Sequence, residues 1–538
     1  KYIIYAFFLH YFRFFYFSYT KKYYIYTIIF LKGYIVIDKL KLHIDKLYVQ
    51  ILLSIISAFL LILSSAGFGY SFAVFIAFIP LLFALNSNKP YFIIIGMVTG
   101  FLYFVVCLSW MVITFGYFGG APVVAAFGLL ILISILGAFF FFVPFTFIYA
   151  KYTKNPIIIS LVFVLLEAIK GTFFFGGVPW LNLAQSQFQN LFILQSVSVF
   201  GEYGLSFLII LLNIFIYNII TNYKLKKNYI ITAIIILIMV MPSIYRYLFP
   251  IPVNDTKKIA VIQPGYSQED KWDDNKRLAI INNIHMQLLS AYNENVDLIV
   301  LPESSYPARV LDTPIITDVL KLVSAKTPII LGTERRIKTE EDKIGKLYNT
   351  MVLIDKGYNL TFYDKRHLTP FGEYFPFITI LRPVKEFFFG KGTMFSAGEN
   401  PVLLTSSNNI KLGPVICFES AFSNLVRDNI LLGANTLVVI SNDTWFGKNQ
   451  GRIQHLAVDT IRAVEYGRAI SRATQDGISA FILPNGKTPL KQQNPQPDVL
   501  IYNVPLSDFR TFYSIFGNIW IAIIIPLLYY QIKRKYKE

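Results

Sequence analysis

The chain has 538 residues, of which 55% are hydrophobic and 17% aromatic, and its formal net charge is +17. This composition is too apolar for a single soluble enzyme, and it favours a membrane protein that carries a polar domain. Much of the Lys and Arg lies beside apolar segments, so we interpret the positive charge as a membrane-surface feature and expect no nucleic-acid partner. The sequence contains no zinc-type Cys/His spacing, P-loop or Rossmann glycine pattern.

The first part of the chain predicts a membrane domain. Residues 1–48 are rich in Tyr, Phe and Lys and form an extension of uncertain role; whether it belongs to the mature protein is left open. Apolar stretches of about 20 residues then predict seven spans within 49–250 and one more in a C-terminal segment, 508–538, that ends in a basic tail. The predicted spans are 50–67, 70–87, 91–114, 121–150, 156–175, 191–220, 229–249 and 511–531.

The charges between these spans predict their orientation. Basic residues precede the first span and follow the second, fourth, sixth and eighth, whereas the alternate loops, 67–70, 115–120 and 176–190, contain neither Lys nor Arg. Because positive loops stay in the cytoplasm, the polar domain between spans seven and eight is predicted to lie on the other side, facing the periplasm or exterior. A transporter is a further reading of eight spans, although the paired broken helices typical of that class are missing from the sequence.

Two features lie at the outer edge of the predicted membrane domain. Glu167 and Lys170 are three residues apart on one helix, so they form either a local ion pair or a contact to a lipid headgroup or the polar domain. The uncharged loop 176–187 carries Trp180 and several amides. It serves either as an interfacial anchor or as the lining of a lipid entrance.

Residues 251–507 predict an α/β domain with its own core, because short β-branched runs alternate with helical patterns. The sequence also predicts an aromatic loop, 376–396, which could form a lid or lipid-contacting arm or could pack into the core of the domain. The predicted strands are 258–263, 297–302, 328–333, 348–355, 360–364, 411–417, 435–441 and 478–484, and the predicted helices are 273–292, 313–325, 420–432 and 453–473.

Three of these strands end in groups that together make a nucleophilic site. Glu303 follows Leu-Pro, Lys365 follows Phe-Tyr-Asp, and Cys417 closes an apolar run. Together these groups could attack an acyl carbon: the carboxylate takes the thiol proton, the ammonium stabilises negative charge, and the thiolate is the nucleophile. Their positions fit this chemistry, because α/β sheets carry their active sites at strand ends. Taken singly, Glu303 could cap a turn, Lys365 could be solvated, and Cys417 could be an inert core residue.

Further polar residues accompany the three candidates. Glu373 and Glu419 could each pair with Lys365, or could accept hydrogen bonds from nearby backbone amides. The turn 441–447, which contains Trp445, is expected to shape the same pocket. The following helix carries His455, for which a Cys–His dyad has no supporting motif, and carries three residues spaced for structural ion pairs, Arg462, Glu465 and Arg468.

These residues resemble the nitrilase (carbon–nitrogen hydrolase) superfamily, whose Glu-Lys-Cys triad lies on an α-β-β-α sandwich. More closely, the chain is similar to the apolipoprotein N-acyltransferases from about residue 50 to its end. The segments that carry the resemblance are Leu301-Pro-Glu303, Lys365 to Glu373, Ile416 to Glu419, Ser441 to Gly447, Arg462 to Gly477 and the membrane loop at Gly177 to Leu181. The order of spans matches as well.

The resemblance implies a role for each matching residue. Glu303 is the general base, Lys365 the oxyanion-stabilising ammonium and Cys417 the nucleophile, with Glu373 and Glu419 as supporting carboxylates. Phe418 stands where the family commonly has Tyr, which leaves its backbone N–H but puts a hydroxyl role in doubt. Trp272 resembles an aromatic near the substrate entrance, and Trp445 and Trp180 are further candidates for substrate contact.

The reaction implied by the resemblance is ping-pong acyl transfer in a bacterial inner membrane, on the periplasmic side. Cys417 takes the sn-1 acyl chain of a phospholipid as a thioester and passes it to the α-amine of an S-diacylglyceryl cysteine at a lipoprotein's N-terminus. Neither a metal nor an organic cofactor is implied. Two rivals stay open: a membrane-tethered amide hydrolase with the same triad, and a non-enzymatic scaffold or transporter with a decayed nitrilase-like domain.

Overall fold

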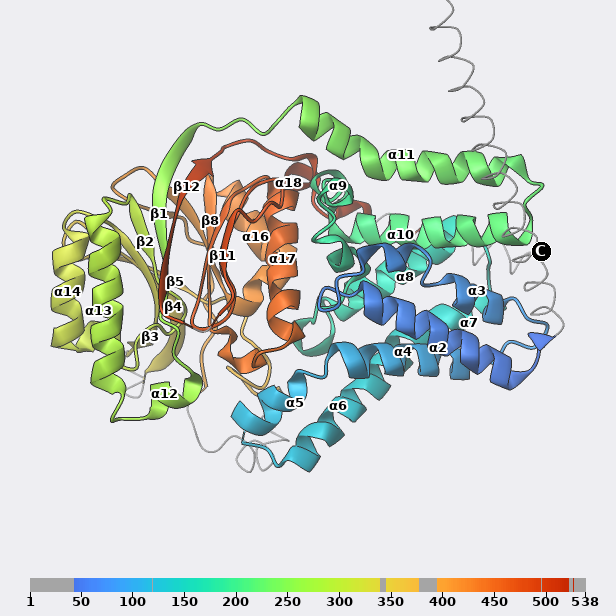
Figure 1. Cartoon of the computed structure of the whole chain (residues 1–538), viewed down its shortest axis with the longest axis horizontal. Helices are drawn as coiled ribbons and strands as arrows, with labels where there is room; N and C mark the ends of the chain where they lie inside the picture. Colours follow the sequence, from blue (N-terminus) through green and yellow to red (C-terminus); the bar gives the residue numbers. More distant parts are fainter. Residues whose placement is uncertain are drawn as a thin grey trace, which may run out of the picture.

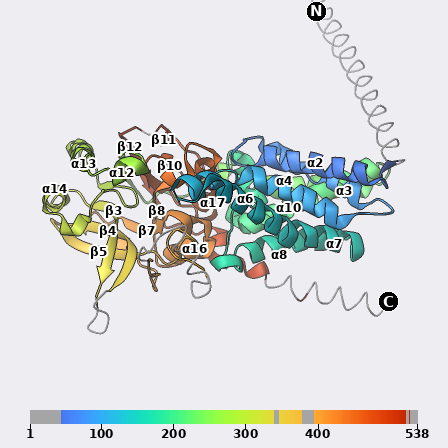
Figure 2. The same cartoon turned by 90° about the horizontal axis from the view of Figure 1, so that it is seen from below.

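The computed structural model of the protein describes residues 43–118, 120–338, 345–376, 394–494, 496–521 and 526. A helical bundle and an α/β domain lie side by side along the long axis of the molecule (Figures 1 and 2). Nearly all of the N-terminal extension, most of the aromatic loop at 376–396 and most of the last predicted span lie outside the described residues.

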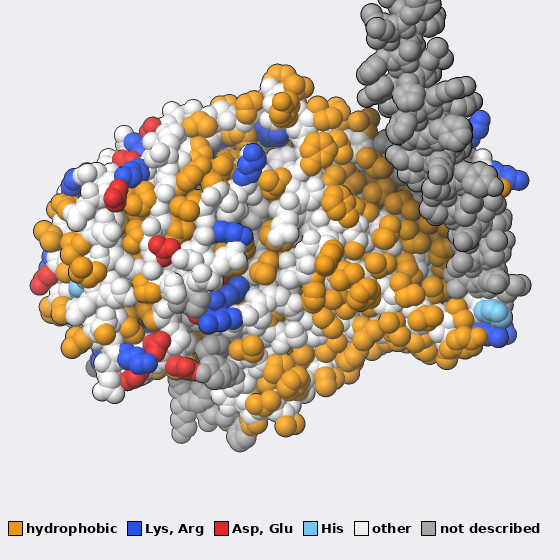
Figure 3. Space-filling view, in the orientation of Figure 1, with side chains coloured by type: hydrophobic (Ala, Val, Ile, Leu, Met, Phe, Trp, Pro, Cys, Tyr) orange, Lys and Arg blue, Asp and Glu red, His pale blue; other side chains and the backbone are white. Residues whose placement is uncertain are grey.

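The bundle is built from helices that contain few polar side chains. Hydrophobic side chains cover the visible face of the bundle, whereas charged side chains gather on the α/β domain (Figure 3). Within the described residues, four helical stretches are long and apolar enough to cross a membrane: Leu47–Ser64, Val123–Lys151, Val197–Thr221 and Lys226–Leu248. The helices are α2 (Leu47–Ser64), α3 (Ile79–Leu85), α4 (Phe92–Cys107), α5 (Met111–Ile113), α6 (Val123–Gly137), α7 (Val143–Lys151), α8 (Pro156–Lys170), α9 (Leu191–Leu194), α10 (Val197–Thr221) and α11 (Lys226–Leu248).

Several predicted spans are not continuous helices: 91–114 contains α4 and α5, and 191–220 contains α9 and most of α10. The segment 70–87 is divided into a 3₁₀ turn, Ser71–Phe75, and the short helix α3. Pro80 lies in the first turn of α3, where it has no N–H to donate to the preceding turn, so the helix starts anew there. The total of eight spans therefore stays a prediction.

The two ends of the bundle differ in their contacts. At one end the side-chain amide of Gln450 donates to the carbonyl of Val106 at 2.7 Å, and Thr114 donates to the carbonyl of Trp445 at 2.8 Å. The basic loops lie at the other end, where Lys154 donates to Asn86 at 2.8 Å. The loop 176–190, which has no Lys or Arg, also contacts the α/β domain, because Trp180 donates to the side chain of Gln454 at 2.8 Å. This contact agrees with the charge pattern.

The α/β domain contains two six-stranded sheets, ordered β12-β1-β2-β3-β4-β5 and β11-β10-β9-β8-β7-β6. One apolar cluster lies between the sheets, a second lies under α13 and α14, and a third lies under α16 and α17, which gives the four layers of an α-β-β-α sandwich. The strands are β1 (Asp255–Gln263), β2 (Leu298–Val300), β3 (Ile329–Ile337), β4 (Lys346–Asp355), β5 (Asn359–Asp364), β6 (Leu404–Thr405), β7 (Lys411–Ile416), β8 (Thr436–Ser441), β9 (Ile470–Thr474), β10 (Ser479–Ile482), β11 (Leu490–Gln492) and β12 (Asp498–Leu506). The helices are α12 (Gln268–Trp272), α13 (Arg277–Asn293), α14 (Pro314–Ser324), α16 (Ser423–Leu431), α17 (Gln450–Tyr466) and α18 (Phe512–Phe516).

The helix predicted at 453–473 is wrong at its C-terminal end. α17 stops at Tyr466, because Gly467 adopts the left-handed conformation at φ 61° and caps it. The chain then enters β9, which is buried along its whole length and pairs in parallel with β8. The helix predicted at 273–292 corresponds to α13, which begins four residues later, at Arg277, and ends at Asn293.

α17 joins the two parts of the molecule. One face of this helix contributes Leu456, Ala463 and Tyr466 to the core of the second sheet, and another face contributes Val458 and Ile461 to the core of the bundle. The helix therefore lies between the sheet and α10, as Figures 1 and 2 show. The active-site strands and the membrane helices are held in one arrangement by this shared element.

Candidate active site

The three predicted residues converge from two sheets. Glu303 follows β2 and Lys365 follows β5 in the first sheet, whereas Cys417 follows β7 in the second. The ammonium of Lys365 lies 3.8 Å from a carboxylate oxygen of Glu303, and both side chains are buried. The charges of both residues act on the thiol of Cys417. Strand ends of two sheets that pack face to face thus assemble a carboxylate, an ammonium and a thiol.

Lys365 is held as a cation by a second carboxylate. Its ammonium lies 2.8 Å from an oxygen of Glu373 and 3.4 Å from the hydroxyl of Thr369, and its side chain is 1% exposed. Burial alone would lower the pKa of Lys365, but the charges of Glu373 and Glu303 outweigh it and raise that pKa above its ordinary value. The side chain therefore carries a fixed positive charge in a water-poor site.

Asn349 on β4 ties the two carboxylates together. Its amide nitrogen donates to an oxygen of Glu303 and to one of Glu373, each at 2.6 Å. The other oxygen of Glu303 accepts the backbone N–H of Asn442 at 2.8 Å. These bonds fix the orientation of Glu303 before any substrate arrives.

Cys417 occupies a strained backbone position at the end of β7. Its φ is 51°, a left-handed conformation that a residue with a Cβ rarely adopts. Burial raises the pKa of the Cys417 thiol above its usual range, and the charge of Glu303 adds to that effect while Lys365 opposes it. The resting group is a neutral thiol, so its activation requires a base.

His455 supports the backbone of the nucleophile. Its Nε2 lies 3.3 Å from the carbonyl oxygen of Cys417, and its Nδ1 lies 2.9 Å from Asp443. Asp443 is also paired with Arg472. In the described contacts the imidazole thus meets the Cys417 carbonyl rather than the thiol, which is not the arrangement of a Cys–His dyad.

The two further carboxylates have different partners. Glu373 pairs with Lys365, whereas Glu419 is buried and accepts the N–H groups of Ile416 at 2.8 Å and Arg366 at 2.7 Å. Glu419 also accepts the hydroxyl of Tyr363 at 2.8 Å. It therefore fixes the Cys417 turn against the segment that carries Lys365.

The aromatic candidates lie in distinct surroundings. Trp180 is buried at the junction of bundle and domain, and its ring centroid is 6.3 Å from that of Phe418 and 5.8 Å from that of His455. Trp445 belongs to the turn that contacts Thr114. Trp272, on α12, is 60% exposed. A substrate contact for any of them stays a prediction.

The pair predicted on α8 is separated in the structure. Lys170 donates to the carbonyl of Trp180 at 2.7 Å, and Glu167 accepts the N–H of Leu183 at 2.8 Å. Both charges therefore fix the 176–190 loop, and no ion pair between them is found among the described residues. These contacts are neither the predicted ion pair nor a contact to the polar domain, because Trp180 and Leu183 belong to the bundle itself.

A buried ionic cluster at the junction was only half predicted. Arg462 pairs with Glu465 at 2.6 Å as expected, and it also pairs with Glu202 of α10. Arg468 takes no part; its guanidinium donates to backbone carbonyls, among them that of Ala434 at 2.8 Å. A lone carboxylate inside a predicted span is a signal that Glu202 has a charged partner, and it could have revealed the cluster.

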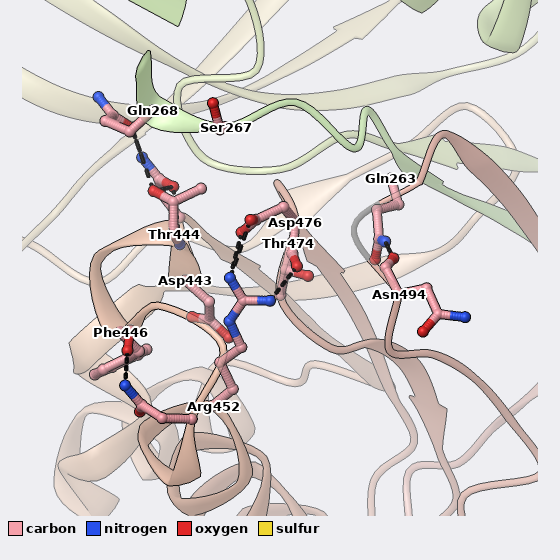
Figure 4. A network of polar contacts seen from close by, with 12 residues as sticks. Gln263, Ser267, Gln268, Asp443, Thr444, Phe446, Arg452, Thr474, Asp476 and Asn494 are labelled. Atoms are coloured by element: carbon pink, nitrogen blue, oxygen red, sulfur yellow. Dashed lines mark hydrogen bonds and ion pairs between the residues drawn. The ribbon is translucent and has the colours of Figure 1, made fainter. Parts of the chain in front are cut away.

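Polar residues from several elements surround the site in a way the sequence did not indicate. Gln268 accepts the side-chain amide of Asn442 at 3.0 Å and the hydroxyl of Thr444 at 3.3 Å, and Figure 4 shows Gln268 facing Thr444. Nearby, Arg452 pairs with Asp476 at 3.0 Å (Figure 4). Among the described residues no group of three or more His, Cys, Asp or Glu could hold a metal ion.

Gly332 on β3 gives a first test of the geometry. A Cβ at this position would lie 2.6 Å from the Cα of Glu303 and 2.9 Å from the backbone nitrogen of Ser304, so Gly332→Ala must displace the backbone that carries the carboxylate. We expect a loss of activity on the order of a hundredfold, because small displacements of catalytic groups have effects of that size. Gly128→Ala is the control, since a Cβ there meets no atom within 4 Å; equal activity of the two variants would contradict the placement.

Comparison with known proteins adds a second kind of evidence. Residues 57–215 match the family model described as the apolipoprotein N-acyltransferase N-terminal domain, and residues 258–513 match that of carbon–nitrogen hydrolase. Relatives called apolipoprotein N-acyltransferase include one from Haemophilus influenzae, 29% identical over 88% of this chain and 92% of the relative. Another, from Geobacter metallireducens, is 30% identical over 87% of this chain and 92% of the relative.

Solved structures similar to this chain include an amidase from Nesterenkonia, with 18% identity and a TM-score of 0.35 over 48% of this chain and 94% of the amidase. Another is Saccharomyces cerevisiae Nit3, with 18% identity and a TM-score of 0.36 over 49% of this chain and 95% of Nit3.

Proposed function

The chain belongs to the apolipoprotein N-acyltransferase family, and from this premise we propose that Cys417, Glu303 and Lys365 carry out acyl transfer through a thioester. The single observation that carries the proposal is the convergence of the three groups, with Lys365 held positive by Glu373 at 2.8 Å. The acyl donor is a phospholipid, and the acceptor is the α-amine of a diacylglyceryl-modified cysteine of a lipoprotein.

In the first half-reaction Glu303 takes the proton of the Cys417 thiol while the sulfur attacks the sn-1 ester carbonyl. The raised thiol pKa supports this role for a base. The ammonium of Lys365 stabilises the oxyanion of the tetrahedral intermediate. When the intermediate collapses, the ester C–O bond breaks, Glu303 returns the proton to the departing oxygen, and a lysophospholipid leaves.

In the second half-reaction the acceptor amine attacks the thioester carbonyl. Glu303 takes a proton from the attacking amine, and Lys365 again stabilises the oxyanion. Collapse breaks the C–S bond, and the proton held by Glu303 returns to the sulfur. The products are an N-acylated lipoprotein and free Cys417, so the reaction is balanced without a cofactor.

We further propose that the α/β domain lies on the periplasmic side of the bacterial inner membrane. The charge pattern of the loops supports this orientation. The two lipid substrates would then reach the site from the outer leaflet, beside the uncharged loops that contact the domain.

A product assay tests the function and its main rival. The purified protein is incubated with a phospholipid labelled in its sn-1 chain and with a diacylglyceryl-cysteine peptide. We expect stoichiometric lysophospholipid and N-acylated peptide. A membrane-tethered amide hydrolase would instead release ammonia from small amides and no lysophospholipid, and that outcome would overturn the proposal.

A further inference from the structure

The short helix α12 (Gln268–Trp272) lies against the chain that carries Glu303. It follows β1 and begins with a capping box, in which Ser267 accepts the N–H of Asp270 and the carboxylate of Asp270 accepts the N–H of Ser267. This reciprocal cap gives a single helical turn a defined conformation. No side chain of α12 takes part in the two proposed half-reactions.

Three side chains of this segment contact the immediate surroundings of Glu303. Lys271 donates from its ammonium to the carbonyl of Ser304 at 2.8 Å, and Tyr266 donates to the carbonyl of Ser305. Gln268 accepts the side-chain amide of Asn442, whose backbone N–H donates to Glu303. The segment thus holds both the chain after the carboxylate and one of the groups that bond to it.

The backbone at Ser304 requires such support. Its φ is 48°, in the left-handed region, and nothing about a serine side chain favours that conformation over the ordinary ones. An ammonium bonded to the Ser304 carbonyl stabilises one orientation of this peptide unit. This peptide unit joins Ser304 to Ser305 and follows Glu303 directly, so holding it restricts the backbone from which the Glu303 carboxylate projects.

We propose that Lys271 is a positioning residue for Glu303, which it orients through the carbonyl of Ser304 and holds beside a positive charge. The inference rests on the proposed function, since it assumes that Glu303 is the base of the reaction. Lys271 does not touch the reacting atoms and acts through the base alone.

The titration of Lys271 offers a readout that a purely structural role lacks. Burial lowers the pKa of Lys271 to about 8, while the nearby carboxylates of Glu303 and Glu334 oppose that effect. The charge is therefore present below about pH 8 and is lost as the pH rises through that value. An arginine at the same position keeps its charge throughout this range.

The test uses the full-length protein in phospholipid vesicles without acceptor, so that only the formation of the acyl adduct on Cys417 is measured. We expect Lys271→Met to slow adduct formation by on the order of tenfold to a hundredfold, as misplacement of a catalytic group does. Lys271→Arg should recover most of the rate. The wild-type rate should fall above about pH 8, and this fall should be absent from Lys271→Arg.

The control is Lys321→Met, which removes an exposed lysine of α14 that lies 3.8 Å from Asp318. Thermal unfolding of each variant verifies that it is folded. If the wild type forms the adduct and a folded Lys271→Met matches its rate, the positioning role is wrong. If Lys271→Met is unfolded, the test is the pH dependence of Lys271→Arg: the positioning role is wrong if the rate of this variant still falls above about pH 8 as in the wild type. If the wild type forms no adduct, the proposed function fails, and the inference fails with it.

Discussion

Replacing Lys365 by Met is expected to slow adduct formation by on the order of a hundredfold or more, because the variant loses the charge that stabilises the oxyanion. The ammonium is almost fully buried and lies within 3.8 Å of Glu303 and 2.8 Å of Glu373. Among the described residues near the site, Lys365 is the cation that contacts both carboxylates. The measurement is the rate of acyl adduct formation on Cys417 from a labelled phospholipid.

The matched control is Lys411→Met, at the exposed first position of β7, the strand that leads to Cys417. We expect this variant to retain the wild-type rate, since Lys411 lies at the opposite end of the strand from the nucleophile. A near-normal rate for Lys365→Met would remove the oxyanion role from this residue.

Lys365→Met should also change how the stability of the protein depends on acidic pH. Burial would raise the pKa of Glu373, but the charge of Lys365 outweighs it and holds that pKa below its ordinary value. A carboxylate with a lowered pKa contributes stability above its unfolded-state pKa, and this contribution is lost as the pH falls through the folded-state value. Lys365→Met should therefore lose this stabilisation already at neutral pH and show a weaker decrease in stability on acidification below about pH 4.5.

Replacing Arg462 by Met is expected to have the largest effect on stability, about 3–5 kcal/mol, because it leaves buried carboxylates without their counter-charge. The guanidinium pairs with Glu465 on its own helix and with Glu202 on α10, and all three side chains are at most 5% exposed. Glu465 also accepts the backbone N–H of Glu202 at 2.7 Å. The cluster therefore fastens α17, and with it the second sheet, to the bundle.

The measurement is the midpoint of thermal unfolding in detergent. The control, Arg277→Met, breaks an exposed ion pair with Asp274, and exposed pairs contribute less than about 1 kcal/mol. Combining Arg462→Met with Glu202→Gln and Glu465→Gln should recover part of the loss, because the unpaired charges disappear. Equal midpoints for Arg462→Met and Arg277→Met would show that the junction does not depend on this cluster.

The sequence allowed the main site residues to be proposed because each follows an apolar strand. The rule that strand ends carry the chemistry of α/β sheets selects Glu303, Lys365 and Cys417, but only the packing of the two sheets brings Cys417 to the other two residues. The choice between Glu373 and Glu419 as the partner of Lys365 stayed open, since it depends on which carboxylate faces the ammonium. Only the packing of the two sheets decides it.

The residues that sequence reasoning missed are polar side chains without a local pattern. Asn349 on β4 bridges two carboxylates, and Gln268 reaches Asn442, which follows β8 of the second sheet. These residues follow no sequence motif or periodic pattern, so their contacts could not be predicted from the sequence. β9 was missed for a different reason, since charged residues at helical spacing continued past Gly467, whose left-handed conformation ends the helix.

The central claim, that Cys417 carries the acyl chain, is tested most directly by the mass of the intact protein after incubation with a phospholipid and no acceptor. The wild type is expected to gain the mass of one acyl chain, located on Cys417 by fragmentation, and Cys417→Ala is expected to gain none. Wild-type protein that binds the phospholipid without acquiring this adduct, or an adduct that persists in Cys417→Ala, would contradict it.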